Sequence, residues 1–373
     1  VKIVAGGLKP VVEPCHLARL EAGGAGGATC IAAVDHFRVG GETEHVAAAV
    51  EVIRHLYRET EATEDISPDT VHLFIRETGF DGVEVHRAGL QARGPGGVEV
   101  TGSAAEVGGD PLPRAWYELL ERAAIVRASD RAQPYVDACG RVTGSARHPV
   151  SPDPGAERRA ARSNGVALHR TFEAAREAAL LELIERDRVL GSWYGELPLR
   201  PAALPERLRP FVSHEWVVRR VDDPAGVEPD ITAVVVVGFP RRSTAPLARG
   251  FAAGRGLAEA SEAAAREALQ NLAFLWDEPV PMRAPEAAPT PLFHLDYYLV
   301  PAHHEALRAW LDGGAGARRR APARSATRYL DLTPPSLSGR ARVVRALATS
   351  TRPLVFGAAP APVAPSRRVH PVA

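Results

Sequence analysis

An acidic motif recurs on three segments of the chain and could support metal-dependent chemistry. In each copy a glutamate is followed three residues later by a carboxylate or an amide, and two copies continue with arginine: Glu118/Glu121/Arg122, Glu182/Glu185/Arg186 and Glu267/Gln270. Positions i and i+3 lie on one face of a helix, so each motif directs two oxygen-bearing side chains the same way.

The residues alone leave two interpretations of these motifs open. A glutamate and an arginine at i and i+4, such as Glu182 and Arg186, commonly decorate a solvated helix face and stabilise it by ~0.2–0.5 kcal/mol. Repetition favours the second interpretation, because four glutamates brought together repel one another unless cations lie between them. Magnesium binds carboxylates together with phosphate oxygens, and arginine binds phosphate through paired hydrogen bonds. The repeated motif therefore predicts a magnesium–carboxylate site that handles ATP.

The basic residues exclude one common nucleotide site. Lysine occurs only at Lys2 and Lys9, so arginine supplies the other 43 of the 45 basic residues. The sequence contains no G-x-x-x-x-G-K-[ST] motif and hence no P-loop with its phosphate-binding lysine. The glycines within Ala22–Ala28 have no convincing strand before them and are interpreted as a flexible loop. A nucleotide must therefore be bound by arginines, backbone amides or metal-bound carboxylates.

The composition is that of a globular protein without a dominant charge. The chain has 373 residues, of which 45% are hydrophobic, and its 45 basic residues balance 45 acidic ones. Zero net charge argues against nucleic-acid binding through a general positive potential, and no apolar run is long enough to span a membrane. Three cysteines, Cys15, Cys30 and Cys139, do not form a disulfide framework. We expect a reduced, cytoplasmic protein that acts on neither nucleic acid nor membrane.

The elements that must position the motifs are predicted to form a mixed α/β fold. A helix follows Asp110-Pro111 and carries the first motif. A second helix starts near Thr171 and carries the second motif, and a third helix carries the third motif. Predicted hairpins join strands at Gly82–Gln91 and Val98–Thr101 and strands at Val212–Val221 and Ile231–Phe239. Further strands are expected at Phe293–Val300 and Tyr329–Leu332, with a helix at Glu305–Asp312 between them, and the tail from Ala358 is expected to be extended.

The first 81 residues are predicted to form a small helical module. Apolar residues at helical spacing predict one helix on a face that contains Val46, Ala49, Val50, Ile53, Leu56 and Tyr57. Ser67-Pro68 is expected to open a second helix that Gly79 closes. We expect residues 1–81 to be a separate, docking module and residues 82–373 to be the catalytic domain.

The order of the motifs resembles that of the YcaO family. Five blocks carry the resemblance: Gly108-Gly109-Asp110 before the first motif, Ser163-Asn164-Gly165-Val166-Ala167 before the second with Asp187 after it, Arg249-Gly250-Phe251 before the third, His294-Leu295-Asp296-Tyr297, and Tyr329-Leu330-Asp331-Leu332-Thr333-Pro334. The likeness covers roughly Gly82 to the carboxyl end. It implies a fold of mixed sheets and helices in which three helices converge on an ATP site.

The resemblance also implies cofactors, site residues and a reaction. In YcaO enzymes ATP phosphorylates the oxygen of a peptide amide after a nucleophile has attacked its carbon, and phosphate then leaves. In azoline formation the nucleophile is a Cys, Ser or Thr side chain of the substrate, so no catalytic residue of the enzyme is assigned. The implied magnesium ligands are Glu118, Glu121, Glu182 and Glu185. The implied ATP contacts are Arg122, Asn164, Arg186, Arg249, Glu267 and Gln270.

The expected function is therefore an ATP-dependent cyclodehydratase that forms azolines in a ribosomally made precursor peptide. Expected partners are that peptide, a leader-peptide-recognition protein, an azoline dehydrogenase and a second copy of the chain in a homodimer. Backbone thioamidation with a sulfur-delivery partner, amidine formation, and a non-catalytic ATP- or peptide-binding scaffold are the alternatives. Two alternatives stay open for the carboxyl-terminal tail. It places His370 or the terminal carboxylate near the reaction, or it is a disordered end.

Other chemical candidates are weaker. His303-His304-Glu305 lacks the second histidine that an H-E-x-x-H zinc site requires. Cys139 has no motif that marks it as a nucleophile. Trp193 and Tyr194 are interpreted as core residues rather than a platform for substrate.

Overall fold

The computed structural model describes ten stretches of the chain: 29–34, 37–42, 52–53, 55–60, 66, 71–128, 132–147, 158–276, 278–313 and 326–373. The chain forms two compact units, each built from three separate stretches. The first unit contains Val1–Pro149, Val166–Ala178 and Tyr329–Arg345, and the second contains Val150–Gly165, Ala179–Arg328 and Ala346–Ala373. One of the points at which the chain passes from one unit to the other falls within helix α4, Phe172–Trp193.

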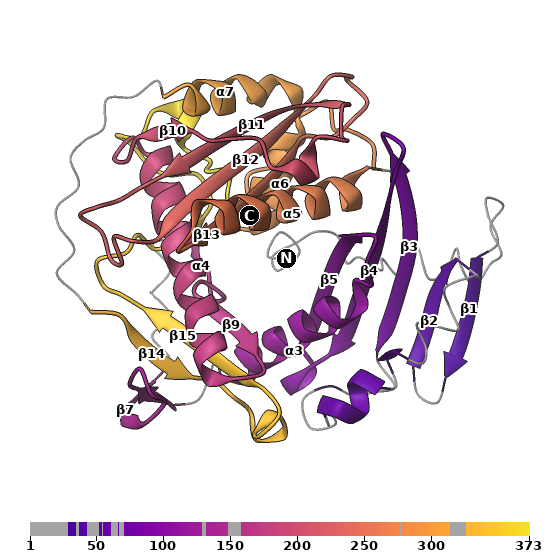
Figure 1. Ribbon diagram of the computed structural model, residues 1–373, viewed down its shortest axis with the longest axis vertical. Coiled ribbons are helices and arrows are strands. Elements are labelled where there is room, and N and C mark those ends of the chain that lie inside the picture. Colours follow the sequence, from indigo (N-terminus) through magenta and orange to yellow (C-terminus); the bar gives the residue numbers. More distant parts are fainter. Residues whose placement is uncertain are drawn as a thin grey trace. The chain divides into compact units, whose positions relative to one another are not determined.

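A five-stranded sheet in the first unit supports helix α3 (Figure 1). Its strands, in spatial order, are β1 (Thr29–Val34), β2 (Phe37–Glu42), β3 (His72–Phe80), β4 (Val83–Arg93) and β5 (Glu99–Val107). Neighbouring strands are antiparallel except β2 and β3. Helix α3, Leu112–Ala128, packs on β4 and β5. Asp110 caps this helix, because its Oδ1 accepts a hydrogen bond from the amide of Leu112 at 2.9 Å.

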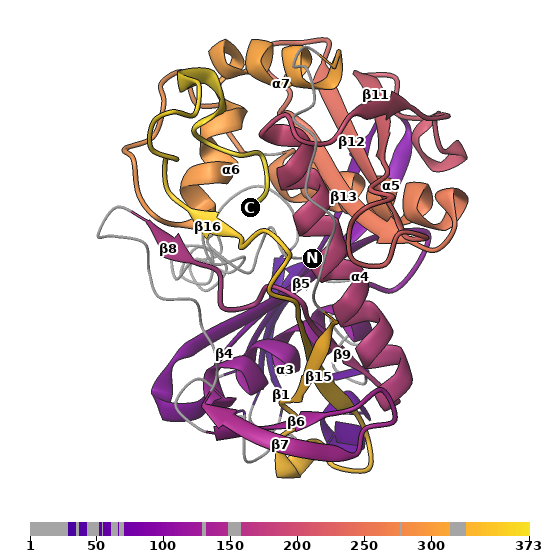
Figure 2. The same ribbon diagram turned by 90° about the vertical axis from the view of Figure 1, so that its left-hand side faces the viewer.

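The second sheet of this unit combines segments that are distant in sequence (Figure 2). Its strands, in spatial order, are β7 (Val142–Arg147), β6 (Ala132–Val136), β14 (Arg328–Asp331), β15 (Arg342–Leu347) and β9 (Val166–His169). Strands β15 and β9 are antiparallel. Because β9 leads directly into α4, this sheet fixes where the helix with the second acidic motif begins.

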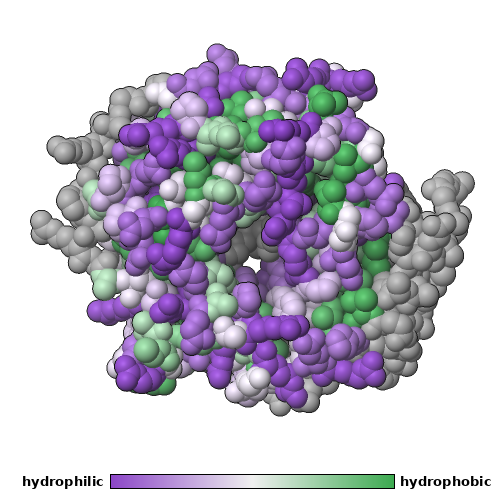
Figure 3. Space-filling model, in the orientation of Figure 1, coloured by the Kyte–Doolittle hydropathy of each residue, from purple (hydrophilic) through white to green (hydrophobic). Residues whose placement is uncertain are grey.

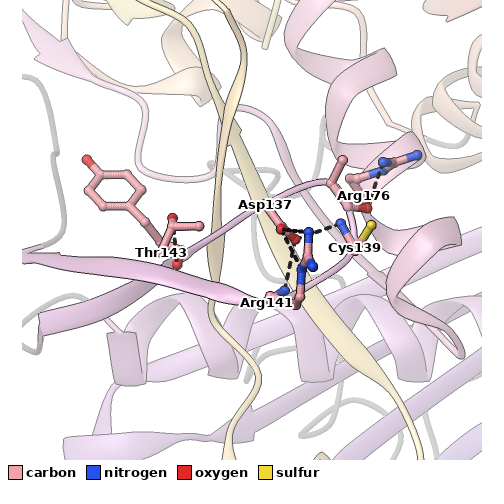
Figure 4. A network of polar contacts seen from close by, with 7 residues as sticks. Asp137, Cys139, Arg141, Thr143 and Arg176 are labelled. Atoms are coloured by element: carbon pink, nitrogen blue, oxygen red, sulfur yellow. Dashed lines mark hydrogen bonds and ion pairs between the residues drawn. The ribbon is translucent and has the colours of Figure 1, made fainter.

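The turn between β6 and β7 also holds the first part of α4 (Figure 4). Asp137 Oδ1 accepts hydrogen bonds from the amides of Cys139 at 2.8 Å and Arg141 at 3.0 Å, and Asp137 Oδ2 accepts one from Arg141 Nε at 2.8 Å. Arg176 of α4 donates to the carbonyl oxygen of Ala138 at 2.9 Å. The aspartate therefore shapes the turn, and the turn is bonded to the helix.

The second unit, like the first, contains a sheet whose last strand is followed by a helix (Figure 1). Its sheet has the order β10 (Leu199–Pro201), β11 (His214–Val221), β12 (Thr232–Pro240) and β13 (Ala248–Gly254). Helix α5, Leu257–Leu275, packs on β12 and β13. Every residue of β13 is buried, so the strand lies in the core of this unit.

The rest of the second unit consists of two short helices, a two-stranded sheet and the carboxyl-terminal tail. The helices are α6 (Pro291–Leu299) and α7 (His304–Leu311), and the strands are β8 (Arg159–Ala160) and β16 (Val355–Phe356) (Figure 2). The tail has one 3-10 turn at Pro365–Arg367. Its last five residues, 369–373, are buried.

Most of the predicted elements are confirmed. The three motif helices form, as do both predicted hairpins, the strand at β14, the helix at α7 and a tail without an α-helix. Residues 52–53 and 55–60 are helical, as the apolar spacing predicted. The mixed α/β fold class is therefore correct.

Two predicted elements are wrong. The expected second helix of the amino-terminal module is strand β3 over its described part, and Gly79 lies within that strand. Buried and less buried residues alternate from Val71 through Arg76, which is the period of a strand, and this alternation outweighs the Ser-Pro signal. The predicted strand Phe293–Val300 is helix α6, because Thr290 caps it by accepting from the Phe293 amide at 3.2 Å.

The predicted glycine loop at 22–28 lies outside the described residues, as does most of the predicted docking module. Strands β3 and β4 pair across position 81, and the division of the chain at that position stays a prediction. The face drawn in Figure 3 mixes hydrophilic and hydrophobic residues. Within the described part of the chain, no helix combines the length and the apolar character that crossing a membrane requires.

Candidate functional site

Close packing between β5 and α3 positions the first acidic motif. A Cβ atom at Gly102 would lie 2.1 Å from the carbonyl oxygen of Ala115 and 2.6 Å from the amide nitrogen of Leu119. No side chain fits at these distances, so only glycine allows the strand to approach this turn of the helix. Glu118 lies on that turn, and its position is therefore set by the backbone contact.

Glu118 and Arg122 form a buried ion pair that is bonded to β5. Arg122 Nη2 contacts Glu118 Oε1. Glu118 Oε2 accepts from the amide of Ser103 at 3.0 Å, and Arg122 Nη1 donates to the carbonyl oxygen and Oγ1 of Thr101 at 2.8 and 2.6 Å. Burial lowers the pKa of Arg122, and the nearby carboxylates of Glu118 and Glu121 oppose that shift. The guanidinium therefore depends on those carboxylates for its charge compensation.

Glu121 reaches the other sheet of the first unit. Its Oε2 accepts a hydrogen bond from the amide of Leu168 in β9 at 2.9 Å. The side chain is half-buried. Glu118 and Glu121 thus share one helix but contact two sheets, and the first motif lies between those sheets.

The second acidic motif is buried on α4, which argues against a solvated helix face. Glu182, Glu185 and Arg186 are each exposed by 8% or less. Arg186 Nη1 lies 2.8 Å from Glu185 Oε1. An i,i+4 pair that only stabilises a solvated helix would stay exposed to water. Burying three ionisable groups is unfavourable unless partners or a ligand compensate their charges.

The segment Asn164-Gly165 lies against the same motif within the second unit. Gly165 has φ +70°, and a Cβ there would lie 2.8 Å from the carbonyl oxygen of Ala346 and 3.3 Å from Cβ of Leu183. Leu183 is the residue after Glu182, so the glycine holds the turn close to the acidic part of α4. The sequence grouped Asn164 with this motif, and the turn brings their backbones together.

Asp187 and Arg188, which follow the second motif, have structural roles. Asp187 Oδ1 accepts from the amide of Arg352 at 2.6 Å, and Arg188 Nη2 donates to the carbonyl oxygen of Glu228 at 2.7 Å. Both side chains are almost fully buried. They join α4 to loops of the second unit.

Arg249 is a buried cation beside the third motif. Its Nη2 donates to the carbonyl oxygen of His294 at 3.1 Å, and its guanidinium carbon lies 5.4 Å from the ring centroid of Tyr298. Burial lowers the pKa of Arg249 to about 10, while Tyr298, Asp296 and Glu267 act in the opposite direction. Glu267 of α5 is therefore close enough to contribute to the electrostatic environment of this arginine.

Unsatisfied polar atoms in the second unit fit a polar, charged ligand. Among the described residues, Asn164 Oδ1, Arg249 Nη1 and Glu267 Oε1 are buried and have no hydrogen-bond partner. A buried donor or acceptor without a partner costs about 1–3 kcal/mol. The set contains a cationic donor and two oxygen acceptors, and a magnesium–phosphate group could satisfy both kinds. The residues implied by the resemblance are thus compatible with ATP and Mg²⁺.

The predicted site residues fall into one set in each unit. Helix α3 brings Glu118, Glu121 and Arg122 together in the first. The second unit contains all the others: Asn164, Glu182, Glu185, Arg186, Arg249, Glu267 and Gln270. The joining of all four glutamates at one magnesium site, and the ATP contacts, stay predictions.

Residues outside the motifs also support the site. Thr101 and Ser103 bind the side chains of the first motif, and Asn271 binds the backbone of Arg249 through a 3.2 Å hydrogen bond. The sequence offers one signal for such supporting residues, which is a glycine at a similar distance before a motif glutamate. Gly102 lies 16 residues before Glu118, and Gly250 lies 17 residues before Glu267.

The weaker candidates have structural explanations. His303 Nδ1 and His304 Nε2 donate to the carbonyl oxygens of Tyr297 at 2.6 Å and Tyr298 at 3.0 Å. Trp193 is fully buried and packs against Tyr298 and Trp310, as the core interpretation predicted. Cys139 is a free, exposed cysteine.

The tail packs around two neighbouring histidine rings, and residues 369–373 are buried, which contradicts the alternative of a disordered end. The rings of His294 and His370 are 4.0 Å apart. His294 Nδ1 donates to the carbonyl oxygen of His370 at 2.8 Å, and its Nε2 accepts from the Gly357 amide at 2.9 Å. His370 Nε2 donates to the carbonyl oxygen of Val355 at 2.9 Å. These bonds require His294 to be neutral, because a proton on Nε2 would oppose the Gly357 N–H.

The histidine pair predicts a loss of stability in acid. Burial lowers the pKa of His370 to about 4 and that of His294 well below its usual value, and Arg249 adds to both shifts. Below about pH 6.5 the unfolded chain binds more protons at these positions than the folded chain. The free energy of unfolding should therefore be greatest above pH 6.5 and fall steadily toward pH 4. Urea unfolding at several pH values measures this slope. The slope should be shallower in His370→Gln. An unchanged slope would contradict the attribution of the acid sensitivity to this histidine pair.

Comparisons with known proteins identify the class of the chain. A family model described as YcaO cyclodehydratase, ATP- and Mg²⁺-binding, matches residues 143–347. No curated protein matches the chain by sequence. A heterocyclase solved in complex with substrate and cofactor is 16% identical, with a TM-score of 0.52 over 80% of this chain and 52% of that one.

Two further similar structures have TM-scores below 0.5. YcaO from Methanopyrus kandleri, bound with AMPPCP and Mg²⁺, is 19% identical over 81% of this chain and 90% of that one, with a TM-score of 0.49. A chain of the E. coli microcin synthetase McbBCD complex is 12% identical over 74% and 87%, with a TM-score of 0.44. The family match spans more than half of the sequence, and the heterocyclase shares the fold. The fold and the motifs define an ATP- and Mg²⁺-binding enzyme class. The chain belongs to the YcaO family.

Proposed function

We propose that this protein is an ATP-dependent cyclodehydratase that converts Cys, Ser or Thr residues of a ribosomally made peptide to azolines. The observation that carries the proposal is the burial of five of the six ionisable residues of the two E-x-x-E-R motifs, in a chain that belongs to the YcaO family. The buried residues are Glu118, Arg122, Glu182, Glu185 and Arg186. A heterocyclase with the same fold was solved with substrate and cofactor, so this fold can accommodate both.

In the proposed mechanism the chain binds and orients, while the peptide supplies the nucleophile. When bound, ATP would supply a phosphoryl group to the amide oxygen after the peptide side chain has attacked the carbonyl carbon, so that the C–O bond could break and the oxygen leave as part of inorganic phosphate. Glu118, Glu121, Glu182 and Glu185 would hold magnesium, since carboxylates are ligands that Mg²⁺ accepts together with phosphate oxygens. Arg122, Arg186 and Arg249 would hold phosphate oxygens.

Asn164, Glu267 and Gln270 are proposed to complete the nucleotide contacts. The unpartnered oxygens of Asn164 and Glu267 support this assignment for two of them. Burial of the surrounding arginines and glutamates would limit the access of water, which strengthens every electrostatic contact with the phosphates.

The proposed partners are the precursor peptide and a protein that recognises its leader, with residues 1–81 as the docking module. An azoline dehydrogenase and a homodimer are proposed on the resemblance alone.

Mass spectrometry of the precursor peptide tests the proposed reaction. Incubation with the chain, its partner protein, ATP and Mg²⁺ should remove one water for each ring formed. A cysteine that has cyclised should no longer react with an alkylating reagent, whereas amidine formation would leave it reactive. Exchange of oxygen for sulfur would identify thioamidation instead, and an unchanged peptide would identify a scaffold.

A further inference from the structure

The two compact units contain the same local arrangement of strand, glycine and acidic helix. In each, three successive antiparallel strands are followed by a helix that packs on the last strand: β3–β4–β5–α3 and β11–β12–β13–α5. A Cβ at Gly250 would lie 2.1 Å from the carbonyl oxygen of Ala264 and 2.4 Å from the amide nitrogen of Ala268. Gly102 meets the same two backbone atoms of α3 at Ala115 and Leu119.

These shared contacts establish which residues are equivalent. Ala115 and Ala264 each precede the first glutamate of a motif by three positions, so Glu118 corresponds to Glu267. By the same spacing Arg122 corresponds to Asn271, and Thr101 on the strand corresponds to Arg249. The arginine therefore occupies different positions in the two units. It lies on the helix in the first unit and on the strand in the second.

The bond between these two positions persists although the residues differ. In the first unit Arg122 Nη1 donates to the carbonyl oxygen of Thr101. In the second, Asn271 Oδ1 accepts from the amide of Arg249 at 3.2 Å. This bond fixes the orientation of the Asn271 amide, because only its oxygen can accept from a backbone N–H.

The other end of the Asn271 amide has donors to offer. Asn271 is 1% exposed, and within the described part of the chain its Nδ2 has no hydrogen-bond partner. Arg249 Nη1 is also buried without a hydrogen-bond partner among the described residues. A buried cation and a buried amide donor therefore lie on two residues that are hydrogen-bonded to each other. A ligand oxygen with negative charge suits both donors better than a neutral group does.

We propose that Asn271 is a further nucleotide-contacting residue, whose Nδ2 donates to a phosphate oxygen beside the Arg249 guanidinium. The proposal rests on the proposed function, since it names a residue of the same ATP site. Asn271 thus has two roles: its oxygen positions β13, and its nitrogen binds the ligand. Glu267, one helical turn earlier, is the neighbouring residue of the same helix that is proposed to contact the nucleotide.

Asn271→Asp separates the two roles. The aspartate keeps an oxygen that accepts from the Arg249 amide, but it replaces the Nδ2 donors with an oxygen that repels phosphate. Calorimetric titration of the full chain with a non-hydrolysable ATP analogue and Mg²⁺ gives the affinity, and competition with adenosine gives the affinity without phosphates. Arg266→Gln on the same helix is the matched control, because it changes the net charge equally.

We expect Asn271→Asp to weaken the binding of the ATP analogue at least tenfold. Its affinity for adenosine, and the affinity of the control variant for the analogue, should stay within about twofold of the values for the original chain. Equal affinity for the analogue, or an equal loss for adenosine, would overturn the proposal. Circular dichroism establishes whether the variant folds, and Asn271→Ser serves for the same comparison if it does not. If the unaltered chain bound no nucleotide, the proposed function would fail as well. If the original chain bound the ATP analogue and Asn271→Asp bound it as tightly as the Arg266→Gln control, only the proposed role of Asn271 would fail.

Discussion

Glu182→Gln is expected to abolish peptide-dependent phosphate release, with a loss on the order of 1000-fold, or ~4 kcal/mol of transition-state stabilisation. Glu182 is buried on α4 beside Glu185 and Arg186. The amide preserves the size of the side chain but removes the negative charge that a magnesium ligand supplies. Phosphate release at saturating Mg²⁺, with and without the precursor peptide, measures the effect.

Glu173→Gln provides the control for this variant. Glu173 is exposed in the first turn of the same helix, so the same chemical change there should leave activity within about twofold. A folded Glu182→Gln protein with full activity would exclude Glu182 from the metal site. Loss of activity in both variants would instead point to a general effect on α4.

Local patterns predicted the elements that carry the motifs. The Asp110-Pro111 cap and the apolar spacing after it define α3, and the turn at Arg93–Gly97 defines the hairpin of β4 and β5. Such signals act over a few residues and do not depend on the rest of the chain. For this reason the three motif helices could be placed correctly from the sequence.

Elements with two competing local signals could not be placed in this way. Ser67-Pro68 suggested a helix start, but the segment that follows alternates with a period of two and pairs with β2 and β4. The segment Phe293–Val300 was predicted to be a strand, whereas the Thr290 cap and Pro291 favour helix α6. Tertiary pairing decides the first case and capping the second.

The candidate site shows the same division. The motif glutamates and arginines were recognisable by spacing, but their burial was not, and burial separates a site from a solvated helix face. Thr101 and Asn271 escaped notice because their partners, Arg122 and Arg249, are about twenty residues away in sequence and meet them only when strand and helix pack.

Gly250→Ala is expected to destabilise the protein by about 3 kcal/mol, the range that overpacking a close backbone contact produces. The added Cβ would lie 2.1 Å from the carbonyl oxygen of Ala264 and 2.4 Å from the amide nitrogen of Ala268. Both are backbone atoms, so relief requires α5 to move away from β13. The free energy of unfolding, measured in urea, reports the loss.

Gly79→Ala is the matched control because a Cβ at Gly79, on strand β3, would meet no described atom within 4 Å. Alanine restricts the unfolded chain more than glycine does, so this variant should be neutral or slightly more stable, by less than about 1 kcal/mol. Movement of α5 would also displace Glu267 and Asn271 from Arg249. Gly250→Ala should therefore weaken nucleotide binding even where the protein stays folded, whereas Gly79→Ala should not. Equal stability of the two variants would mean that α5 does not need this contact to hold its acidic face against β13.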